Sequence, residues 1–316
     1  MGGILIAGNI LVDRINEIRA YPASGQLEKI KNVKMAVGGC VPNVAIDLKK
    51  LSPSLHVAAS GKIGRDDNGN FVFSALAENG VDTSGIRISD KPTSFTEVMS
   101  VTGSERTFFT FAGASADFGF SDIDFESFDV SMLHLGYFLL LDKVDAGDGV
   151  EILKEAKRRG ITTSIDMVTE NSDRYSLVRN ALQYVDNIII NEAEAAGLSG
   201  NYDSLDGAAH SIRDMGVSER VIIHSPKFSL CLSNNGLFSV PSLDLPKDFI
   251  KGSTGAGDAF CAACLLSIYA GKSEEEMLSF ASAAAACNLS EADSVSGMRS
   301  EAEVRAIAEK YGRLKL

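Results

Sequence analysis

From Val130 onward, short apolar runs alternate with longer segments of helical periodicity. The expected strands are 130–135, 161–166, 187–190 and 221–224, and the expected helices between them are 145–159, 174–184 and 203–215. Because neighbouring parallel strands need a long crossover connection, this alternation predicts a mainly parallel sheet with helices on both faces. A buried strand over 4–7 and a hairpin of 230–233 with 236–240 complete the expected doubly wound α/β fold.

Two inserted segments, about 14–37 and 93–112, depart from this alternation. Residues 27–37 alternate only partly, and 93–101 with 106–111 predict a hairpin. We expect them to form a small β-sheet that acts as a lid and excludes water from a substrate; the alternative is a hairpin of the main sheet. No repeat or Pro/Gly/Ser-rich linker divides the 316 residues, so we expect a single α/β domain over 1–316.

The composition limits the partners and the compartment. A formal net charge of -12 argues against nucleic acid, whose binding requires Lys and Arg to neutralise phosphates. No stretch approaches the length of a membrane span, the N-terminus lacks a basic leader, and the five cysteines are an odd number. We therefore expect a cytoplasmic protein with reduced thiols and with no membrane or nucleic-acid partner.

A glycine-containing loop, GSTGAGD over 252–258, precedes a long apolar run. A buried helix that begins here would direct unpaired N–H groups and the positive end of its dipole at an anion bound in the loop. Asp258 would lie in the first turn as a carboxylate that can accept a hydroxyl proton. An anion site and a carboxylate that lie together are suited to phosphoryl transfer. A structural loop capped by Asp258 is the alternative.

Two motifs resemble those of the ribokinase-like (PfkB) carbohydrate kinases: GAGDAF at 255–260 and GGCVPNVA at 38–45. The resemblance implies an ATP-dependent transferase that moves the γ-phosphoryl group to a hydroxyl of a small sugar, as ribokinases and fructokinases do. Asp258 would be the general base, with the amides of Gly255, Ala256 and Gly257 as the anion hole. The implied substrate-binding residues are Asp13, which follows the first strand, together with Gly38, Gly39 and Asn43.

The nucleotide region matches the family less closely. The sequence NEAE at 191–194 resembles the family's Asn-x-x-Glu motif, which implies that Glu194 organises Mg²⁺ through water and that Asn191 lies by the nucleotide. A helix cap is the alternative for Asn191. After the strand that ends at His224, Pro226 and Ser229 replace two family glycines, and Ser225 and Lys227 are the remaining candidate nucleotide contacts.

The resemblance also bears on potassium and on assembly. Many relatives are activated by K⁺ through an Asp that is Gly252 here, so we expect little K⁺ activation and a requirement for Mg²⁺. The lid implies a homodimer. A nucleoside kinase of the same family and a non-catalytic sugar- or nucleotide-binding protein are alternatives; the lost glycines favour the latter and Asp258 argues against it. A dehydrogenase would need a Gly-x-Gly-x-x-Gly fingerprint, which is missing.

Overall fold

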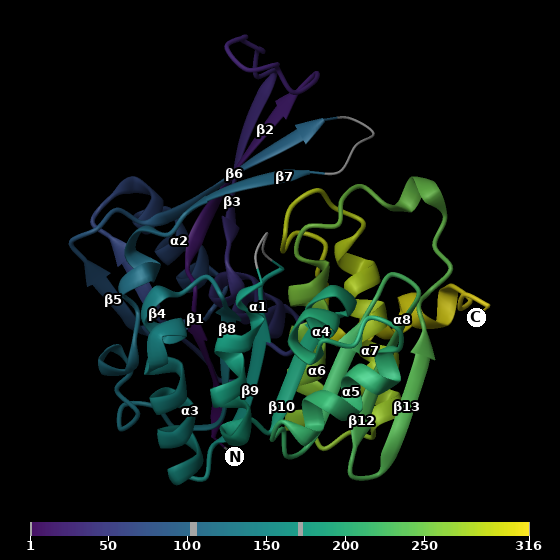
Figure 1. Cartoon of the computed structure of the whole chain (residues 1–316). Helices are drawn as coiled ribbons and strands as arrows, with labels where there is room; N and C mark the ends of the chain where they lie inside the picture. The colour runs from purple at the N-terminus through teal and green to yellow at the C-terminus, as the bar shows by residue number, and fades with distance from the viewer. Residues whose placement is uncertain (1, 102–105, 170–172, 316) are drawn as a thin grey trace.

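The computed structural model describes residues 2–101, 106–169 and 173–315. Across these ranges a large sheet of nine strands crosses the molecule (Figure 1). In spatial order its strands are β13 (Gly236–Pro241), β12 (Phe228–Ser233), β11 (Arg220–His224), β10 (Asn187–Asn191), β9 (Thr162–Met167), β8 (Val130–Phe138), β1 (Gly3–Gly8), β4 (Val57–Gly64) and β5 (Asp82–Ser89). Only β12 and β13 run antiparallel to their neighbours, which confirms the expected mainly parallel α/β fold.

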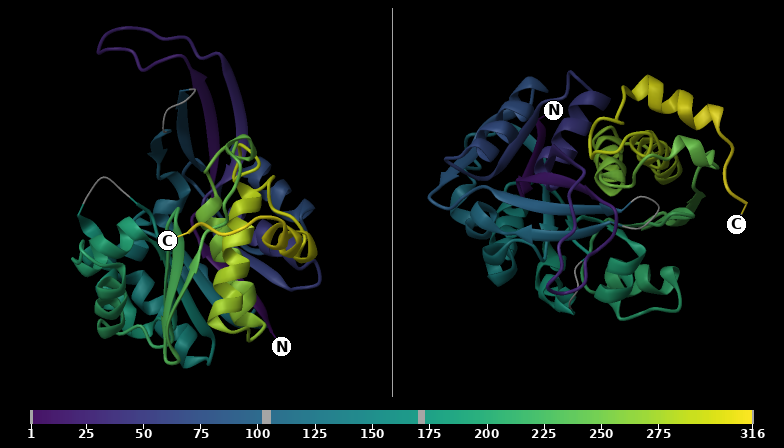
Figure 2. Two further views of the ribbon diagram at one scale, coloured as in Figure 1. Left: turned by 90° about the vertical axis from the view of Figure 1, so that its right-hand side faces the viewer. Right: turned by 90° about the horizontal axis from the view of Figure 1, so that it is seen from above.

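Helices cover both faces of this sheet (Figure 2). One layer contains α1 (Cys40–Leu51), α2 (Asp67–Glu78), α6 (Ala256–Tyr269), α7 (Glu274–Asn288) and α8 (Glu301–Lys310). The other contains α3 (Gly149–Arg158), α4 (Glu192–Ser199) and α5 (Leu205–Asp214). Two apolar cores result, one beneath each helical layer, and the buried β1 contributes Ile4 and Ile6 to one core and Leu5 and Ala7 to the other. That division follows from the alternation of side chains along a strand.

A smaller, four-stranded sheet projects from one edge of the molecule (Figures 1 and 2). Its order is β3 (Asn32–Gly38), β2 (Leu11–Ile18), β6 (Ser94–Val101) and β7 (Thr107–Phe111). The predicted hairpin is therefore present, as antiparallel β6 and β7, and pairs outside the main sheet. Its role as a lid stays a prediction.

Several local predictions were wrong. β2 was not expected, and it begins at Leu11, before the predicted start of the insert. Strand β5 was also missed. The predicted helix at 174–184 is a 3₁₀ segment. The apolar positions in this segment allowed either helical form, since the periods of 3.0 and 3.6 residues differ little over such a length.

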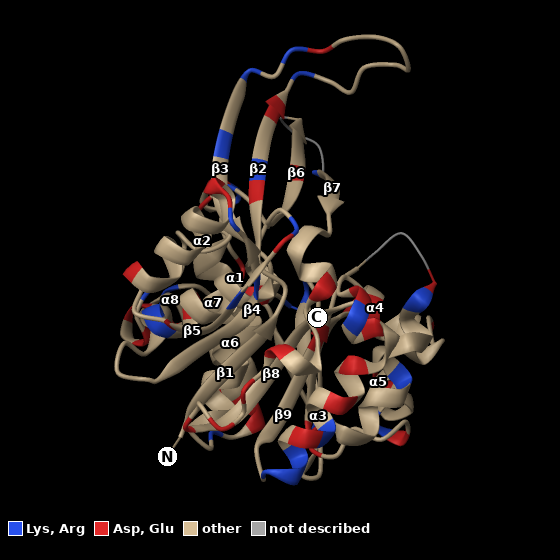
Figure 3. Ribbon diagram, turned by 90° about the vertical axis from the view of Figure 1, so that its left-hand side faces the viewer, with Lys and Arg blue, Asp and Glu red and all other residues tan. Residues whose placement is uncertain are grey.

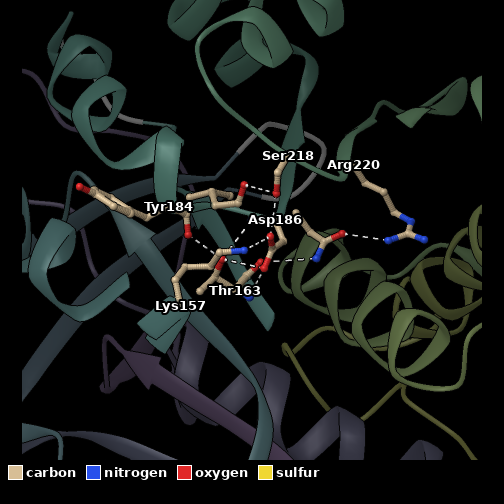
Figure 4. A network of polar contacts seen from close by, with 8 residues as sticks. Lys157, Thr163, Tyr184, Asp186, Ser218 and Arg220 are labelled. Carbon is tan, nitrogen blue, oxygen red and sulfur yellow. Dashed lines mark hydrogen bonds and ion pairs between the residues drawn. The ribbon is translucent and has the colours of Figure 1, made fainter. Parts of the chain in front are cut away.

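A polar network ties together the edge of the large sheet where β9 and β10 begin (Figure 4). The Asp186 carboxylate accepts hydrogen bonds from Lys157 Nζ (2.5 Å), Ser218 Oγ (2.7 Å) and the Thr163 amide (2.9 Å). Burial opposes ionisation, yet these donors lower the pKa of Asp186. The network thus stabilises the edge at which the strands start and leaves the carboxyl ends of the strands free for ligands.

Among the described helices, none combines the length and the apolar character needed to cross a membrane.

Candidate active site

The candidate site lies at the carboxyl ends of the central parallel strands. Tyr137, Asp166, Asn191 and His224 come at or near the ends of β8, β9, β10 and β11. All four line a cavity of about 210 Å³ together with Asp258. This edge is where open α/β sheets bind their ligands, because the loops diverge there and leave a crevice.

The anion site at the start of α6 stays a prediction, and the local backbone geometry is compatible with it. Gly255 takes a left-handed conformation (φ 79°), and a Cβ there would lie 2.4 Å from the carbonyl oxygen of Ser294. Only glycine fits this position without displacing the neighbouring chain. Helix geometry leaves the amides of Gly257 and Asp258 without intrahelical acceptors. The Ala256 amide, by contrast, already donates weakly to the Ser253 carbonyl (3.3 Å), so Gly257 and Asp258 are the better donors to a ligand.

Two side chains from distant parts of the sequence hold the Asp258 carboxylate. Asn43 Nδ2 in α1 donates to Asp258 Oδ2 at 2.9 Å. The hydroxyl of Tyr137 lies 3.2 Å from Oδ1 and 3.1 Å from Oδ2. Because both donors come from packed elements, they fix the direction of the carboxylate before any substrate binds.

Burial and, to a smaller extent, the negative charge of Asp166 raise the pKa of Asp258, whose net value is about 8. Hydrogen bonds from Asn43 and Tyr137 oppose this shift, since they favour the ionised form. A carboxyl group with a pKa near the working pH is suited to general base catalysis, in which it must both accept a proton and release it.

Asp13 follows β1, as the sequence indicates, and lies within β2 of the small sheet; its role in substrate binding stays a prediction. Its side chain is mostly buried, and burial raises its pKa to about 7 while the positive charge of Arg106 acts in the opposite direction. Gly38 in β3 pairs with Leu11, and a Cβ at Gly38 would lie 2.6 Å from Asp13 Oδ2. Gly39 has a φ of 87° and leads into α1. The two glycines therefore allow Asp13 and Asn43 to approach the same region.

Asn43 retains an unused acceptor. Its Oδ1 atom is buried and has no hydrogen-bond partner among the described residues. A buried polar atom without a partner costs free energy unless a ligand or water satisfies it. The atom is therefore available to a substrate hydroxyl, although Asn43, Asp13 and the two glycines do not line either of the two cavities described here.

A larger cavity of about 670 Å³ adjoins the first, and Thr169, Asn191, His224 and Gly257 line both. Its volume is within the range of about 300–1,000 Å³ typical of small-molecule sites. Polar groups gather at the shared end, whereas the remote end is mostly apolar: Leu243, Leu245, Ile250, Ala285, Ala286, Leu289 and Leu314. A ligand with a charged end and a flat apolar end matches this distribution.

Glu194 and Asn191 form a reciprocal helix cap at the start of α4. Asn191 Oδ1 accepts from the Glu194 amide, and Glu194 Oε2 accepts from the Asn191 amide, each at 2.9 Å. Thr169 donates to Glu194 Oε1 at 2.7 Å. Burial raises the pKa of Glu194 to about 7, and these hydrogen bonds oppose the shift. The cap and a functional role are compatible, because both residues also line the smaller cavity.

The oxygen atoms at this end of the cavity fit a magnesium ion held partly through water. Mg²⁺ prefers carboxylate, amide and hydroxyl oxygens and keeps several waters of its own. Glu194, Asn191, Thr169 and Asp166 supply such atoms around the smaller cavity. Each oxygen of Glu194 has a protein donor and a further lone pair that a bound water can use.

The candidate residues at and after the end of β11 lie in different surroundings. His224 lies under the start of α6, with its ring 4.9 Å from that of Phe260, and burial lowers its pKa to about 4, so it is a neutral, packed side chain. Ser225 lines the larger cavity, although its Oγ also donates to the Phe228 carbonyl at 2.9 Å. Lys227 is exposed and lines neither cavity.

Sequence reasoning missed Tyr137 and Asp166. Tyr137 has a positive φ of 63°, which is uncommon for a residue with a side chain, and its amide donates to Asp166 Oδ1. Asp166 ends the strand predicted at 161–166, so a carboxylate at a strand terminus was an available signal. Nothing in the sequence around Tyr137 indicated that its hydroxyl would reach Asp258, 121 positions away.

Comparisons with known proteins agree with this site. The family model described as pfkB family carbohydrate kinase matches residues 6–301. A ribokinase of Arabidopsis thaliana is 25% identical over 293 residues, covering 89% of this chain and 74% of the relative. A relative from the same plant, described as a probable fructokinase-7, is 24% identical over 318 residues, covering 94% of this chain and 90% of the relative. The structure of Arabidopsis thaliana ribokinase complexed with ribose and ATP superposes with a TM-score of 0.82 at 22% identity, covering 98% of this chain and 99% of the other.

The family match and the ribokinase and fructokinase relatives show a phosphotransferase with an alcohol group as acceptor. The chain belongs to the pfkB family of carbohydrate kinases, and it is a sugar kinase of that family.

Proposed function

We propose that the protein transfers the γ-phosphoryl group of ATP to a hydroxyl of a small neutral sugar, with Asp258 as the general base. The observation that carries this proposal is the position of Asp258. Its carboxylate lies in the first turn of α6, held by Asn43 and Tyr137, beside amides that can bind developing phosphate charge. A sugar hydroxyl placed against it would lose its proton to Asp258 as its oxygen attacks the γ-phosphorus.

The larger cavity suits ATP. The adenine ring fits the apolar end, and the phosphates would extend past Asn191 and Ser225 to the start of α6. Mg²⁺, when bound through water by Glu194 and its neighbours, would neutralise phosphate charge. The solved structure of Arabidopsis thaliana ribokinase with ribose and ATP supports this choice of co-substrate.

The preference for a neutral sugar follows from the cations near Asp13. Arg106 donates to Thr254 Oγ1 and to the Ala292 carbonyl (3.1 Å), and Lys34 pairs with Asp293 at 2.6 Å. Both cations already have partners within the protein. An anionic group on the substrate would therefore face the Asp13 carboxylate, and neither Arg106 nor Lys34 would be free to pair with it. Hydroxyl groups can instead donate to Asp13 and to Asn43 Oδ1.

We also propose a homodimer through the small sheet and a cytoplasmic location. Phe108, Phe109 and Phe111 in β7 are 43–59% exposed, and Val33 and Met35 in β3 are 58% and 44% exposed. Strand β7 has no charged residue and is tan throughout in Figure 3. Apolar side chains on a projecting sheet favour burial against a second copy, and in the closed state the sheet would cover the sugar. All five cysteines are free, as expected in a reducing compartment.

A substrate panel tests the proposal. Purified protein with Mg-ATP would be assayed for ADP formation with pentoses, hexoses, sugar acids and nucleosides, alongside thermal shifts for each ligand. We expect turnover with one or more neutral sugars. Turnover confined to nucleosides would overturn the sugar assignment. Thermal stabilisation by sugars without ADP formation would favour the non-catalytic alternative.

A further inference from the structure

A cluster of metal-ligating side chains lies beside the candidate active site, and one of its members, Asp166, also lines the smaller cavity. Cys40, His134 and Asp166 each place one ligand atom so that the three atoms lie within 4.8 Å of one another. They come from α1, β8 and β9, and all three residues are buried. A thiol, an imidazole and a carboxylate are ligands of Zn²⁺ and related transition metals, whereas Mg²⁺ takes oxygen ligands.

The distances are close to those that a bound ion needs. His134 Nε2 lies 3.4 Å from Asp166 Oδ2, and Cys40 Sγ lies within 4.8 Å of both atoms. Ligand atoms about 2.0–2.3 Å from a tetrahedral zinc are separated by roughly 3.3–3.8 Å, so a small contraction completes the geometry. Cys261 Sγ lies 3.5 Å from His134 Nε2 but does not belong to the group of atoms that gather within 4.8 Å, so the three residues are the protein ligands.

The surroundings orient these ligands. His134 Nδ1 faces Ser164 Oγ at 3.1 Å, so a proton on Nδ1 leaves Nε2 with a free lone pair toward Asp166. Asp166 Oδ1 is fixed by the Tyr137 amide, which directs Oδ2 toward His134. Gly136 makes room for the thiol, because a Cβ there would overlap Cys40 Sγ.

We propose that Cys40, His134 and Asp166 form a binding site for a thiophilic divalent transition metal, of which Zn²⁺ is the type. An ion can enter from the smaller cavity, which Asp166 and Cys261 line. Binding replaces the S–H bond of Cys40 with a metal–sulfur bond and releases the proton to solvent. No oxidation occurs in this step. The site shares Asp166 with the oxygen atoms offered for Mg²⁺ but does not include Glu194, Asn191 or Thr169, and its existence does not depend on the proposed kinase activity.

Cobalt provides the test, because a cobalt–thiolate bond gives a charge-transfer band in the near ultraviolet. The protein would be stripped with a chelator, kept reduced with a phosphine and titrated with Co²⁺, followed by Zn²⁺ competition. We expect one equivalent of Co²⁺ with the thiolate band, displaced by Zn²⁺ and unaffected by excess Mg²⁺. Absence of the band in the unaltered protein, or displacement by Mg²⁺, would overturn the proposal.

Variants assign the ligands. Cys40→Ser should abolish the band. It should also weaken Co²⁺ binding by more than the roughly 10- to 100-fold that is typical when a residue that only hydrogen-bonds to a metal ligand is lost. Cys287→Ser is the matched control, since Cys287 is a free, buried thiol in α7, outside the cluster, and it should keep both band and affinity. If Cys40→Ser does not fold by circular dichroism, His134→Gln replaces it and should weaken binding equally. A band that persists in folded Cys40→Ser, or a Co²⁺ affinity that is unchanged in folded His134→Gln, contradicts the assignment.

Discussion

Replacement of Asp258 by Asn should change how stability depends on pH. The folded-state pKa of Asp258 is raised to about 8 from an ordinary value of 3.8, chiefly by burial. The folded protein therefore binds a proton that the unfolded chain has released, and this contribution to stability is complete below pH 3.8 and lost as the pH rises through about 8. At about 1.4 kcal/mol per pKa unit, the loss between pH 6 and pH 9 is about 3 kcal/mol.

The assay is urea unfolding of the unaltered protein and of Asp258→Asn at several values between pH 6 and pH 9. Asn has no carboxyl proton to lose, so the variant should gain about 3 kcal/mol relative to the unaltered protein over this range. Asp13→Asn is the matched control: with a pKa of about 7, its relative gain should be about half as large and should occur at lower pH. Parallel stability curves for the unaltered protein and Asp258→Asn would refute the reasoning.

Three further predictions concern binding, pH and ions. Asp13→Ala should weaken sugar binding by about 1.5–3 kcal/mol, measured by calorimetry; unchanged affinity would remove Asp13 from the site. Tyr137→Phe removes a hydrogen-bond donor that favours the ionised form of Asp258. The acid limb of the pH–rate profile should therefore move to higher pH by about one pH unit or more. An acid limb that does not move would contradict this role of Tyr137. Replacing Na⁺ with K⁺ should leave turnover nearly unchanged. The Arg106 guanidinium lies so close to Gly252 that a Cβ there would be 3.2 Å from it, and this positive charge disfavours a second cation at the position. Strong activation by K⁺ would refute this prediction.

The sequence predicted the main sheet because parallel strands buried on both faces form clear apolar runs, such as those of β1 and β10. It also predicted the start of α6, since Gly255 requires a backbone conformation that few other residues adopt. Strand β2 was missed. Its sequence, LVDRINEI, mixes charged and apolar residues although none of them is exposed, because its polar side chains find partners within the small sheet, as Arg14 and Asn16 do with Glu97.

Contacts between distant segments were harder to predict. The motifs containing Asn43 and Asp258 were both recognised, but the hydrogen bond between them joins residues 215 positions apart. Tyr137 was not recognised because its role depends on a left-handed backbone conformation near the end of β8, at a position where the sequence has no glycine. The same holds for the cluster of Cys40, His134 and Asp166, which comes together only when α1, β8 and β9 pack.

The most direct test of the central claim is the turnover of Asp258→Asn on the sugar identified by the substrate panel. Asn keeps the shape of the side chain and its bond to Tyr137, but it cannot accept the hydroxyl proton. We expect kcat to fall by about 10²- to 10⁴-fold, while the dissociation constants for sugar and Mg-ATP stay nearly unchanged. Near-normal turnover by the folded variant would contradict the account, because it would reduce Asp258 to a structural residue at the start of α6.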